Sequence, residues 1–198
     1  SSHNQFYADC YRAMSQALQY HVVQVLEMLS AVKLSGDFEF AGIDSSAAPS
    51  KNCASLPKVY ELMGLPYLGA AGSVEVSALL TKVFKSIQHV PLVGFSGLML
   101  AVTEDLGLAE GTQKQYFDIR ALLTYSAVCG IGLDTVPVAG NVKAESIAAI
   151  MRDTGTMAFR LNKPLTVRLF PIPNKVAGEI SEFESDDLCN CCLLHIPD

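Results

Sequence analysis

Residues 125–137 read YSAVCGIGLDTVP, and this stretch indicates how the chain folds. Its first glycine is predicted to end an apolar helix and its second to precede a short strand, because glycine adopts backbone conformations that other residues avoid. The strand leads directly to Asp134 and Thr135. Pro137 is then expected to stop it, since proline lacks the N–H group that a sheet ladder requires.

Helices and strands are predicted to alternate on both sides of this stretch. Apolar residues recur at three- and four-residue steps over residues 4–33, which predicts one long helix. Further helices are expected at about 55–63, 73–88, 113–128 and 141–161, and strands at 38–43, 91–102 and 165–170. This alternation indicates the α/β class with a mainly parallel sheet.

The predicted strand at 165–170 has two chemically different faces. Leu165, Val167 and Leu169 form an aliphatic face that is expected to meet the helices. Arg168 then points the opposite way. Its guanidinium needs a carboxylate there, because an unpaired buried charge is very costly.

Composition limits the classes of partner. Half of the 198 residues are apolar, only 17% are charged and the mean hydropathy is +0.29. A soluble domain typically has about a quarter of its residues charged, so we expect apolar surface to pack against another domain or subunit, as in a homo-oligomer. The net charge of −6, without a Lys/Arg cluster, argues against a nucleic-acid partner. No apolar run reaches the roughly 18 residues of a membrane span.

The chain is interpreted as one unit with three parts: a long helical segment (1–36), an α/β core (37–178) and an acidic, cysteine-rich tail (179–198). Cys10, Cys53 and Cys129 stand singly inside predicted elements, which indicates reduced thiols in a cytoplasmic protein. The tail holds the ligand types for zinc or copper, in Cys189, Cys191, Cys192 and His195. Their spacing fits no structural zinc pattern, so adventitious metal binding or thiol oxidation in a mobile tail is the favoured interpretation.

Carboxylates stand at or just past the predicted strand ends, at Asp44, Glu104, Asp105 and Asp134. In parallel α/β architectures, this edge of the sheet is where ligands bind. Ser45 and Thr135 add hydroxyl groups nearby. Such oxygen atoms suit a hard divalent cation, with Asp44 and Asp134 as the expected metal ligands, or a polyhydroxy ligand. The alternative is that these residues are helix caps and structural ion pairs.

Three residues are candidates for catalysis, namely Asp134, Arg168 and Cys129. Arg168 either pairs with Asp134 or holds a carboxylate or phosphate substrate in a bidentate grip. Cys129 is a possible nucleophile, yet it follows the end of a predicted helix, where the dipole disfavours a thiolate. A packed thiol is therefore the favoured interpretation of Cys129.

Three blocks stand in order along the chain: GFSGLMLAVTED (94–105), YSAVCGIGLDTVPVAG (125–140) and LNKPLTVRLFPIP (161–173). Together with FAGIDSS (40–46), they resemble the family catalogued as domain of unknown function 711, whose members are labelled pyruvate-formate-lyase-like. The resemblance covers about residues 38–178. It implies half of a ten-stranded α/β barrel similar to that of glycyl radical enzymes, built from two five-stranded parallel halves. Family members are longer, so the resemblance also implies that this chain corresponds to their C-terminal half and meets an N-terminal half or another subunit.

The sequence departs from the family pattern at several positions. Alanine stands at 101 and 139 where proline is usual, Asn141 where aspartate is usual and Asn174 where glycine is usual. Residues 175–178 and the adjacent Cys191 and Cys192 are only loosely similar to the radical glycine motif and the cysteine pair of pyruvate formate-lyase. Radical chemistry is not expected, because the flanking arginine and tyrosine are missing and the cysteines follow the glycine.

Two classes of function remain open. One is an enzyme or ligand-binding protein, metal-dependent in one version, with a pocket that uses Asp134, Arg168 and Asp44. The other is a non-catalytic regulatory or scaffolding protein on the same fold. The two classes differ in the interior of the fold. Packing alone would fill it with aliphatic side chains, whereas a binding site requires polar residues that point into it.

Overall fold

Six helices and two strands, joined by long irregular segments, form the part of the chain that the computed structural model describes, residues 2–33, 36–47, 49–50 and 53–197. In chain order they are α1 (His3–Ser30), α2 (Leu56–Leu62), α3 (Ser73–Phe84), α4 (Leu106–Gln113), α5 (Ile119–Ser126), β1 (Gly132–Ala139), α6 (Ala144–Leu161) and β2 (Thr166–Ile172). The chain is thus of the mixed α/β class, with a small parallel sheet. Within this part of the chain, no helix is both long and apolar enough to cross a bilayer.

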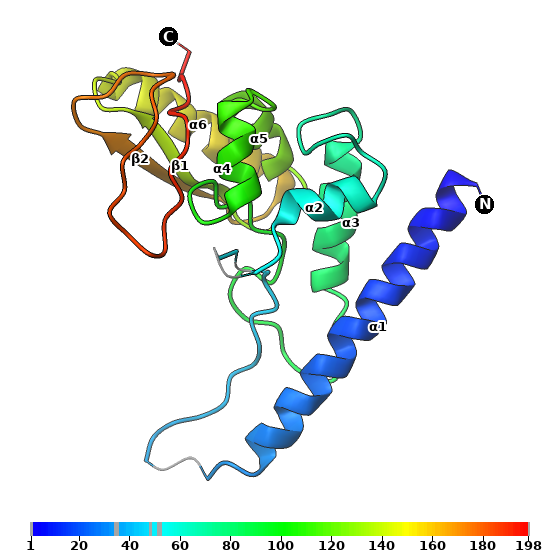
Figure 1. The fold of residues 1–198 in the computed structure, drawn as a ribbon. Coiled ribbons are helices and arrows are strands. Elements are labelled where there is room, and N and C mark those ends of the chain that lie inside the picture. The colour runs from blue at the N-terminus through cyan, green and yellow to red at the C-terminus, as the bar shows by residue number, and fades with distance from the viewer. Residues whose placement is uncertain (1, 34–35, 48, 51–52, 198) are drawn as a thin grey trace.

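The long N-terminal helix is confirmed, and it is largely exposed. It begins at the cap Ser2, whose side chain accepts a hydrogen bond from the backbone N–H of Gln5. Val22 is the one residue of α1 that is buried among those described. Figure 1 shows α1 as a rod beside α3, lying well apart from the sheet. The helix therefore has little of the chain to pack against.

The two strands pair in parallel, and β1 is longer than predicted. Gly132 lies opposite Thr166 at one end and Ala139 opposite Ile172 at the other. The prediction that Pro137 stops the strand is wrong. The carbonyl of Pro137 accepts from the N–H of Leu194 at 2.9 Å. Because a residue's N–H and C=O point to the same side of a strand, the missing donor falls on the side away from β2.

The predicted strands at 38–43 and 91–102 do not form as regular strands. Isolated parallel bridges join these regions to each other and to β1, at Ile43↔Leu92, Ala47↔Leu98 and Ala101↔Asp134. The extended segments therefore lie in chain order and run parallel. Their pairing is interrupted because Gly94 and Ser96 both have positive φ angles, of 60° and 44°.

Gly97 allows the second of these extended segments to approach the backbone just before β1 closely. A Cβ atom at Gly97 would lie 2.6 Å from the Cα of Gly130, and Gly130 donates its N–H to the carbonyl of Leu98 at 2.7 Å. Neither position has room for a side chain. The glycine of the quoted stretch that was expected to end a helix therefore serves a backbone contact, since α5 ends earlier, at Ser126.

The core lies between β1 and the helices. Leu133, Val136 and Val138 of β1 are fully buried, and α5 packs against this strand. Val167 and Leu169 pack on the same core, whereas the Arg168 side chain is 48% exposed. The predicted division of this strand into an aliphatic face and an Arg168 face is confirmed.

The C-terminal tail is packed, which corrects the expectation that it is mobile. Leu194 bridges to Val138 in parallel, and Cys189 donates its N–H to the carbonyl of Thr103 at 2.6 Å. Cys191 is fully buried and lies in a small cluster with Cys189, Ala109 and Phe183. Leu194 and Ile196, which follow the acidic residues, are buried in the main hydrophobic core, so this end of the tail belongs to the core.

Candidate functional site

A β-bulge in β1 positions the candidate site. Leu133 lies opposite Val167, and Val136 lies opposite Leu169, so Asp134 and Thr135 together face the single residue Arg168. Asp134 is thus inside the strand, not at or just past its end as predicted. Bulges are frequent beside active sites because they re-aim side chains.

Thr135 is the extra residue of this bulge, and its backbone conformation is strained. Its φ angle is 45°, in the left-handed region that β-branched residues avoid. Such a conformation costs about 1–3 kcal/mol and persists only where surrounding contacts enforce it. Here the Thr135 hydroxyl accepts from the backbone N–H of Thr103 at 3.3 Å, and the residue is fully buried. Strain that a structure retains at a buried polar position is typical of functional sites.

Asp134 is fully buried and paired on one side only. Its Oδ1 accepts from Nε and Nη2 of Arg168 at 2.6 and 2.5 Å. Its Oδ2 has no hydrogen-bond partner among the described residues, and the same holds for the hydroxyl of Thr103, which is also fully buried. Buried polar atoms are almost always hydrogen-bonded in native proteins. The two atoms belong to neighbouring segments, which the Ala101↔Asp134 bridge joins.

Glu104 completes the charge cluster, which we call the bulge site (Thr103, Glu104, Asp134, Thr135 and Arg168). Its Oε1 accepts from Nη2 of Arg168 at 3.3 Å. Burial raises the pKa of Glu104, the negative charges of Asp134 and Asp187 raise it further, and Arg168 opposes them. One guanidinium therefore serves two carboxylates, through its Nε and Nη2 atoms.

The pKa of Asp134 is also raised. Burial is the largest cause, and the hydrogen bonds and positive charge of Arg168, with a backbone hydrogen bond from Thr135, offset it only in part. A raised pKa on two adjacent carboxyl groups favours the protonated form of one of them, as general acid–base chemistry requires. The prediction that Arg168 pairs with a carboxylate is confirmed by its hydrogen bonds to Asp134 and Glu104.

Asp44 and Ser45 lie in a different network from the bulge site. Oδ1 of Asp44 accepts from the N–H and hydroxyl of Ser46 at 3.0 and 2.7 Å and from the N–H of Ser96 at 3.0 Å. Burial raises the pKa of Asp44, but these hydrogen bonds outweigh it and leave the pKa lowered. Ser45 donates to the carbonyl of Phe84 at 2.5 Å. Both residues organise the loop between two extended segments.

Asp105 is a buried structural cap. It accepts from the N–H groups of Gly107 and Leu108 at 2.9 and 3.1 Å, at the start of α4. Its other oxygen accepts from the N–H of Leu56 at 2.7 Å, and Ser55 donates its hydroxyl to the first. Both carboxylate oxygens are used in holding α2 and α4 together, which fits the cap alternative for this residue.

Cys129 is a packed thiol rather than an exposed one. Its Sγ accepts from the N–H of Gly132 at 3.3 Å, and the residue is 1% exposed. Lys163, which sequence reasoning missed, donates to the carbonyls of Cys129 and Ala127 at 2.5 and 3.4 Å. Burial lowers the pKa of this lysine. Its place directly after α6 is the one sequence signal that could have suggested a capping role.

The donor atoms do not fit a divalent metal ion. Across the described ranges, no three His, Cys, Asp or Glu side chains gather in an arrangement that could hold one. The expected ligands Asp44 and Asp134 belong to separate networks, and Arg168 already occupies Oδ1 of Asp134. In the tail, burial raises the pKa of Cys191 to about 11, with Cys189 and Cys192 adding to it, so its thiolate form is disfavoured.

Comparison with known proteins gives a consistent family. Residues 2–185 match the model described as Uncharacterised ACR (DUF711). The UPF0210 protein of Pyrobaculum arsenaticum is 37% identical over 144 residues, which cover 71% of this chain and 32% of that protein. The UPF0210 protein of Carboxydothermus hydrogenoformans is 31% identical over 170 residues, covering 83% and 37%.

The chain spans about a third of the length of these curated relatives. No solved structure matches it significantly. The family model covers α1, the bulge site and both strands, so the resemblance noted in the sequence blocks extends to nearly the whole chain. This chain therefore belongs to the DUF711 family of uncharacterised proteins.

Proposed function

We propose that the bulge site binds a small, polar, uncharged or cationic molecule and that Glu104 exchanges a proton with it. The observation that carries this proposal is the pair of buried, unpartnered oxygen atoms, Oδ2 of Asp134 and the hydroxyl of Thr103. An ionised carboxylate only accepts hydrogen bonds, so Asp134 requires a donor such as a ligand hydroxyl or ammonium group. The threonine hydroxyl can then donate to or accept from the same molecule.

The charge balance selects the class of ligand. Arg168 already donates to Asp134 and Glu104, and Asp187 adds a further negative charge near Glu104. A carboxylate or phosphate ligand would raise the excess of negative charge and is therefore disfavoured. Polyhydroxy compounds and amines fit, whereas the metal-dependent version finds no support in the donor set.

Roles follow from accessibility. Asp134 is fully buried and anchors the ligand, and Arg168 positions Asp134. The Glu104 side chain is 27% exposed, so it can exchange protons with solvent between steps. A partly exposed carboxyl group with a raised pKa, beside buried and strained residues, is suited to general acid–base catalysis.

Titration with glycerol, erythritol and acetate tests this proposal, with backbone amide shifts of Thr103, Asp134 and Thr135 in NMR spectra as the readout. The polyols are expected to shift these amides and acetate is not. Thr103→Val should abolish the polyol response. Thr124→Val is the matched control, because Thr124 is an exposed helical residue that bonds to Arg120 of its own helix. Ordered water bound to both orphan oxygens, with no polyol response, would instead support the regulatory or scaffolding alternative.

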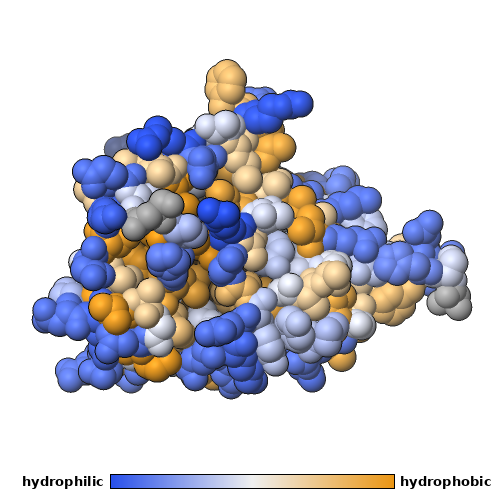
Figure 2. Space-filling model, turned by 90° about the horizontal axis from the view of Figure 1, so that it is seen from above, coloured by the Kyte–Doolittle hydropathy of each residue, from blue (hydrophilic) through white to orange (hydrophobic). Residues whose placement is uncertain are grey.

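A second proposal concerns the surface of α1 and the expectation that apolar surface packs against another domain or subunit. Large apolar side chains reach solvent on α1 and just after it, at Phe6, Tyr20, Val23, Val25, Met28, Leu29, Val32, Phe38 and Phe40. In the view from above, hydrophobic residues also reach the surface between hydrophilic ones (Figure 2). We propose that the remainder of the longer family polypeptide covers α1, since curated relatives are about three times as long as this chain. The parallel, chain-ordered segments support one half of a barrel as the geometry of that assembly.

Mixing this chain with the remaining two-thirds of a family polypeptide tests the covering of α1. Light scattering should show a one-to-one complex, and Met28→Glu and Phe38→Glu should weaken it. Glu27→Gln serves as the control on the same helix. If the chain instead associates with itself and the added polypeptide has no effect, a second copy of this chain covers α1, as in a homo-oligomer.

A further inference from the structure

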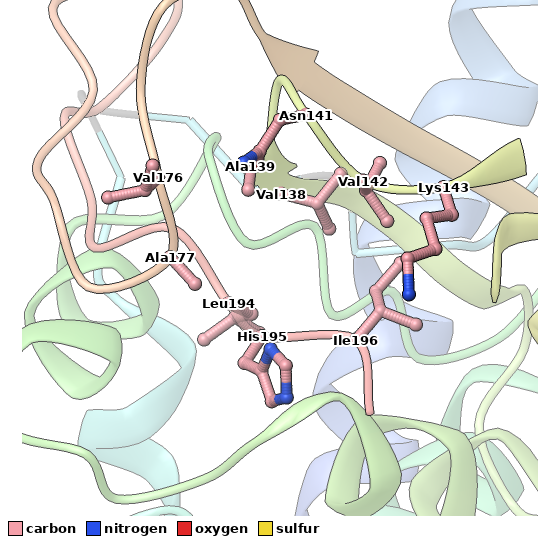
Figure 3. Close-up of a pocket in the computed structure, with 10 residues that line it drawn as sticks. All are labelled: Val138, Ala139, Asn141, Val142, Lys143, Val176, Ala177, Leu194, His195 and Ile196. Carbon is pink, nitrogen blue, oxygen red and sulfur yellow. The ribbon is translucent and has the colours of Figure 1, made fainter. Parts of the chain in front are cut away.

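Residues 179–193, which we call the tail strap, form a loop with a fixed base. A backbone hydrogen bond of 2.9 Å, from the N–H of Ser181 to the carbonyl of Cys191, joins its two arms. Figure 3 shows where the arms meet the core, with Ala177 just before the first arm and Leu194 just after the second, beside the turn that follows β1. The strap is therefore anchored at the carboxyl end of β1.

The far part of the strap contacts both segments that carry the bulge site. Cys189 donates its N–H to the carbonyl of Thr103 at 2.6 Å. The ring of Phe183 packs edge-to-face against that of Phe170, with the ring centroids 6.4 Å apart. Phe170 follows Arg168 by two residues and so lies on the same face of β2. The strap therefore bridges the segment of Thr103 and the strand of Arg168.

This bridge brings Asp187 beside the bulge site. Asp187 stands two residues before Cys189, and Glu104 directly follows Thr103. The hydrogen bond between Cys189 and Thr103 thus places the two carboxylates on adjacent stretches of chain. The backbone N–H of Asp187 donates to the hydroxyl of Ser185 at 3.1 Å, which fixes the turn that presents the Asp187 side chain.

The charges that act on Glu104 come from three elements. Burial is the largest cause of its raised pKa; Asp134 of β1 and Asp187 of the strap raise it as well, while Arg168 of β2 lowers it. Three carboxylates therefore share one guanidinium, and the site keeps an excess of negative charge. Within that site, Oδ2 of the fully buried Asp134 has no hydrogen-bond partner among the described residues.

We propose that Asp187 is a specificity-determining residue of the bulge site, which favours an amine over a neutral polyol of the same size. This inference rests on the proposed function and narrows its ligand from uncharged or cationic to cationic. An ammonium group has three donors and no acceptor, so it suits the unpartnered oxygens of Asp134 and Thr103. Asp187 is exposed, so it acts by attracting the cation and not by holding it.

Three probes that share a three-carbon skeleton test the selection: aminopropanediol, glycerol and glycerate. Binding is followed by the backbone amide shifts of Thr103, Asp134 and Thr135. Aminopropanediol is expected to bind more tightly than glycerol, and glycerate not to bind. Asp187→Asn should weaken aminopropanediol binding roughly two- to fivefold, as expected for an exposed charge, and leave glycerol binding unchanged. Asp186→Asn is the matched control, because it removes the same charge from the neighbouring exposed residue.

The outcomes separate this inference from the function on which it rests. Glycerol binding without a preference for aminopropanediol would overturn the role of Asp187 and leave the proposed function standing. Equal losses in Asp187→Asn and Asp186→Asn would also overturn it, because net charge alone would then be responsible. The absence of a response to all three probes would overturn both proposals.

A measurement without ligand tests the placement of the strap. The side-chain carboxyl carbon of Glu104 is titrated by NMR in the wild type and both variants. Asp187→Asn should lower the pKa of Glu104, because it removes a nearby negative charge, whereas Asp186→Asn should not. An unchanged pKa of Glu104 in Asp187→Asn would show that Asp187 does not act on the bulge site.

Discussion

Arg168 directs two donors at one oxygen of Asp134 and leaves the other oxygen of that carboxylate unpaired. The two residues are 34 positions apart in the chain and meet because the bulge turns Asp134 toward β2. One side of the carboxylate therefore serves the fold, while the other remains for a ligand.

Replacing Arg168 with methionine should destabilise the protein by about 1–3 kcal/mol at neutral pH, because it leaves the buried Asp134 carboxylate without a counter-charge. The loss is smaller than for a fully buried ion pair, since the Arg168 side chain is 48% exposed and solvent screens its charge. The loss should shrink in acid, where Asp134 is protonated. Urea unfolding at several pH values measures it, with the exposed Arg152→Met as control; a loss that does not change with pH would contradict the assignment.

Glu104→Gln should flatten the dependence of unfolding free energy on pH. A carboxyl group whose pKa is higher in the folded protein binds more protons when folded, so its contribution to stability falls as pH rises. The fall begins near the unfolded value of about 4.3 and ends above the raised folded value. Glu184→Gln, in the exposed part of the tail, should keep the wild-type slope. Identical slopes for wild type and Glu104→Gln would sink this prediction.

Thr103→Val should leave the free protein as stable as the wild type, or more stable by about 1 kcal/mol. The substitution removes a buried hydroxyl that has no partner among the described residues, while its backbone N–H still donates to Thr135. Thermal unfolding measures the change. A clear destabilisation would mean that the hydroxyl is already satisfied, for example by bound water, and would weaken the case for a ligand.

Two glycine substitutions should have opposite effects on the free energy of unfolding. Gly97→Ala places a Cβ against the backbone of Gly130 and should destabilise by about 1–3 kcal/mol, through separation of two extended segments. Gly155→Ala meets nothing within 4 Å and lies inside α6, so it should stabilise by up to about 1 kcal/mol. Chemical unfolding of both variants checks the pair. Equal effects would show that the close approach at Gly97 is not present in solution.

Thiol labelling should separate the tail cysteines from the exposed one. Cys53 is exposed and should react within minutes, whereas Cys191 is fully buried, with a pKa raised to about 11 by burial, and should react only on unfolding. Mass spectrometry of partly labelled protein identifies the sites, and Cys53→Ser confirms the fast one. Rapid labelling of Cys191 in native buffer would contradict the packed tail and support the original expectation that the tail is mobile.

Local patterns in the sequence predicted the features that depend on neighbouring residues. The helical periodicity of residues 4–33 and the alternation around Arg168 each follow from a few consecutive side chains, and both are confirmed. The need of Arg168 for a carboxylate follows from its charge alone. The class, mixed α/β with parallel pairing, follows from the order of such segments.

Tertiary structure decided the rest. Neither the bulge at Asp134 and Thr135 nor the separation of Asp44 from the bulge site is visible in the sequence, because both depend on how distant segments align. Packing of the tail against β1 likewise depends on space that only the folded core leaves open. Periodicity predicts which face of an element is buried. Register and close approach arise only when elements pack together, and these determined the position of the bulge site.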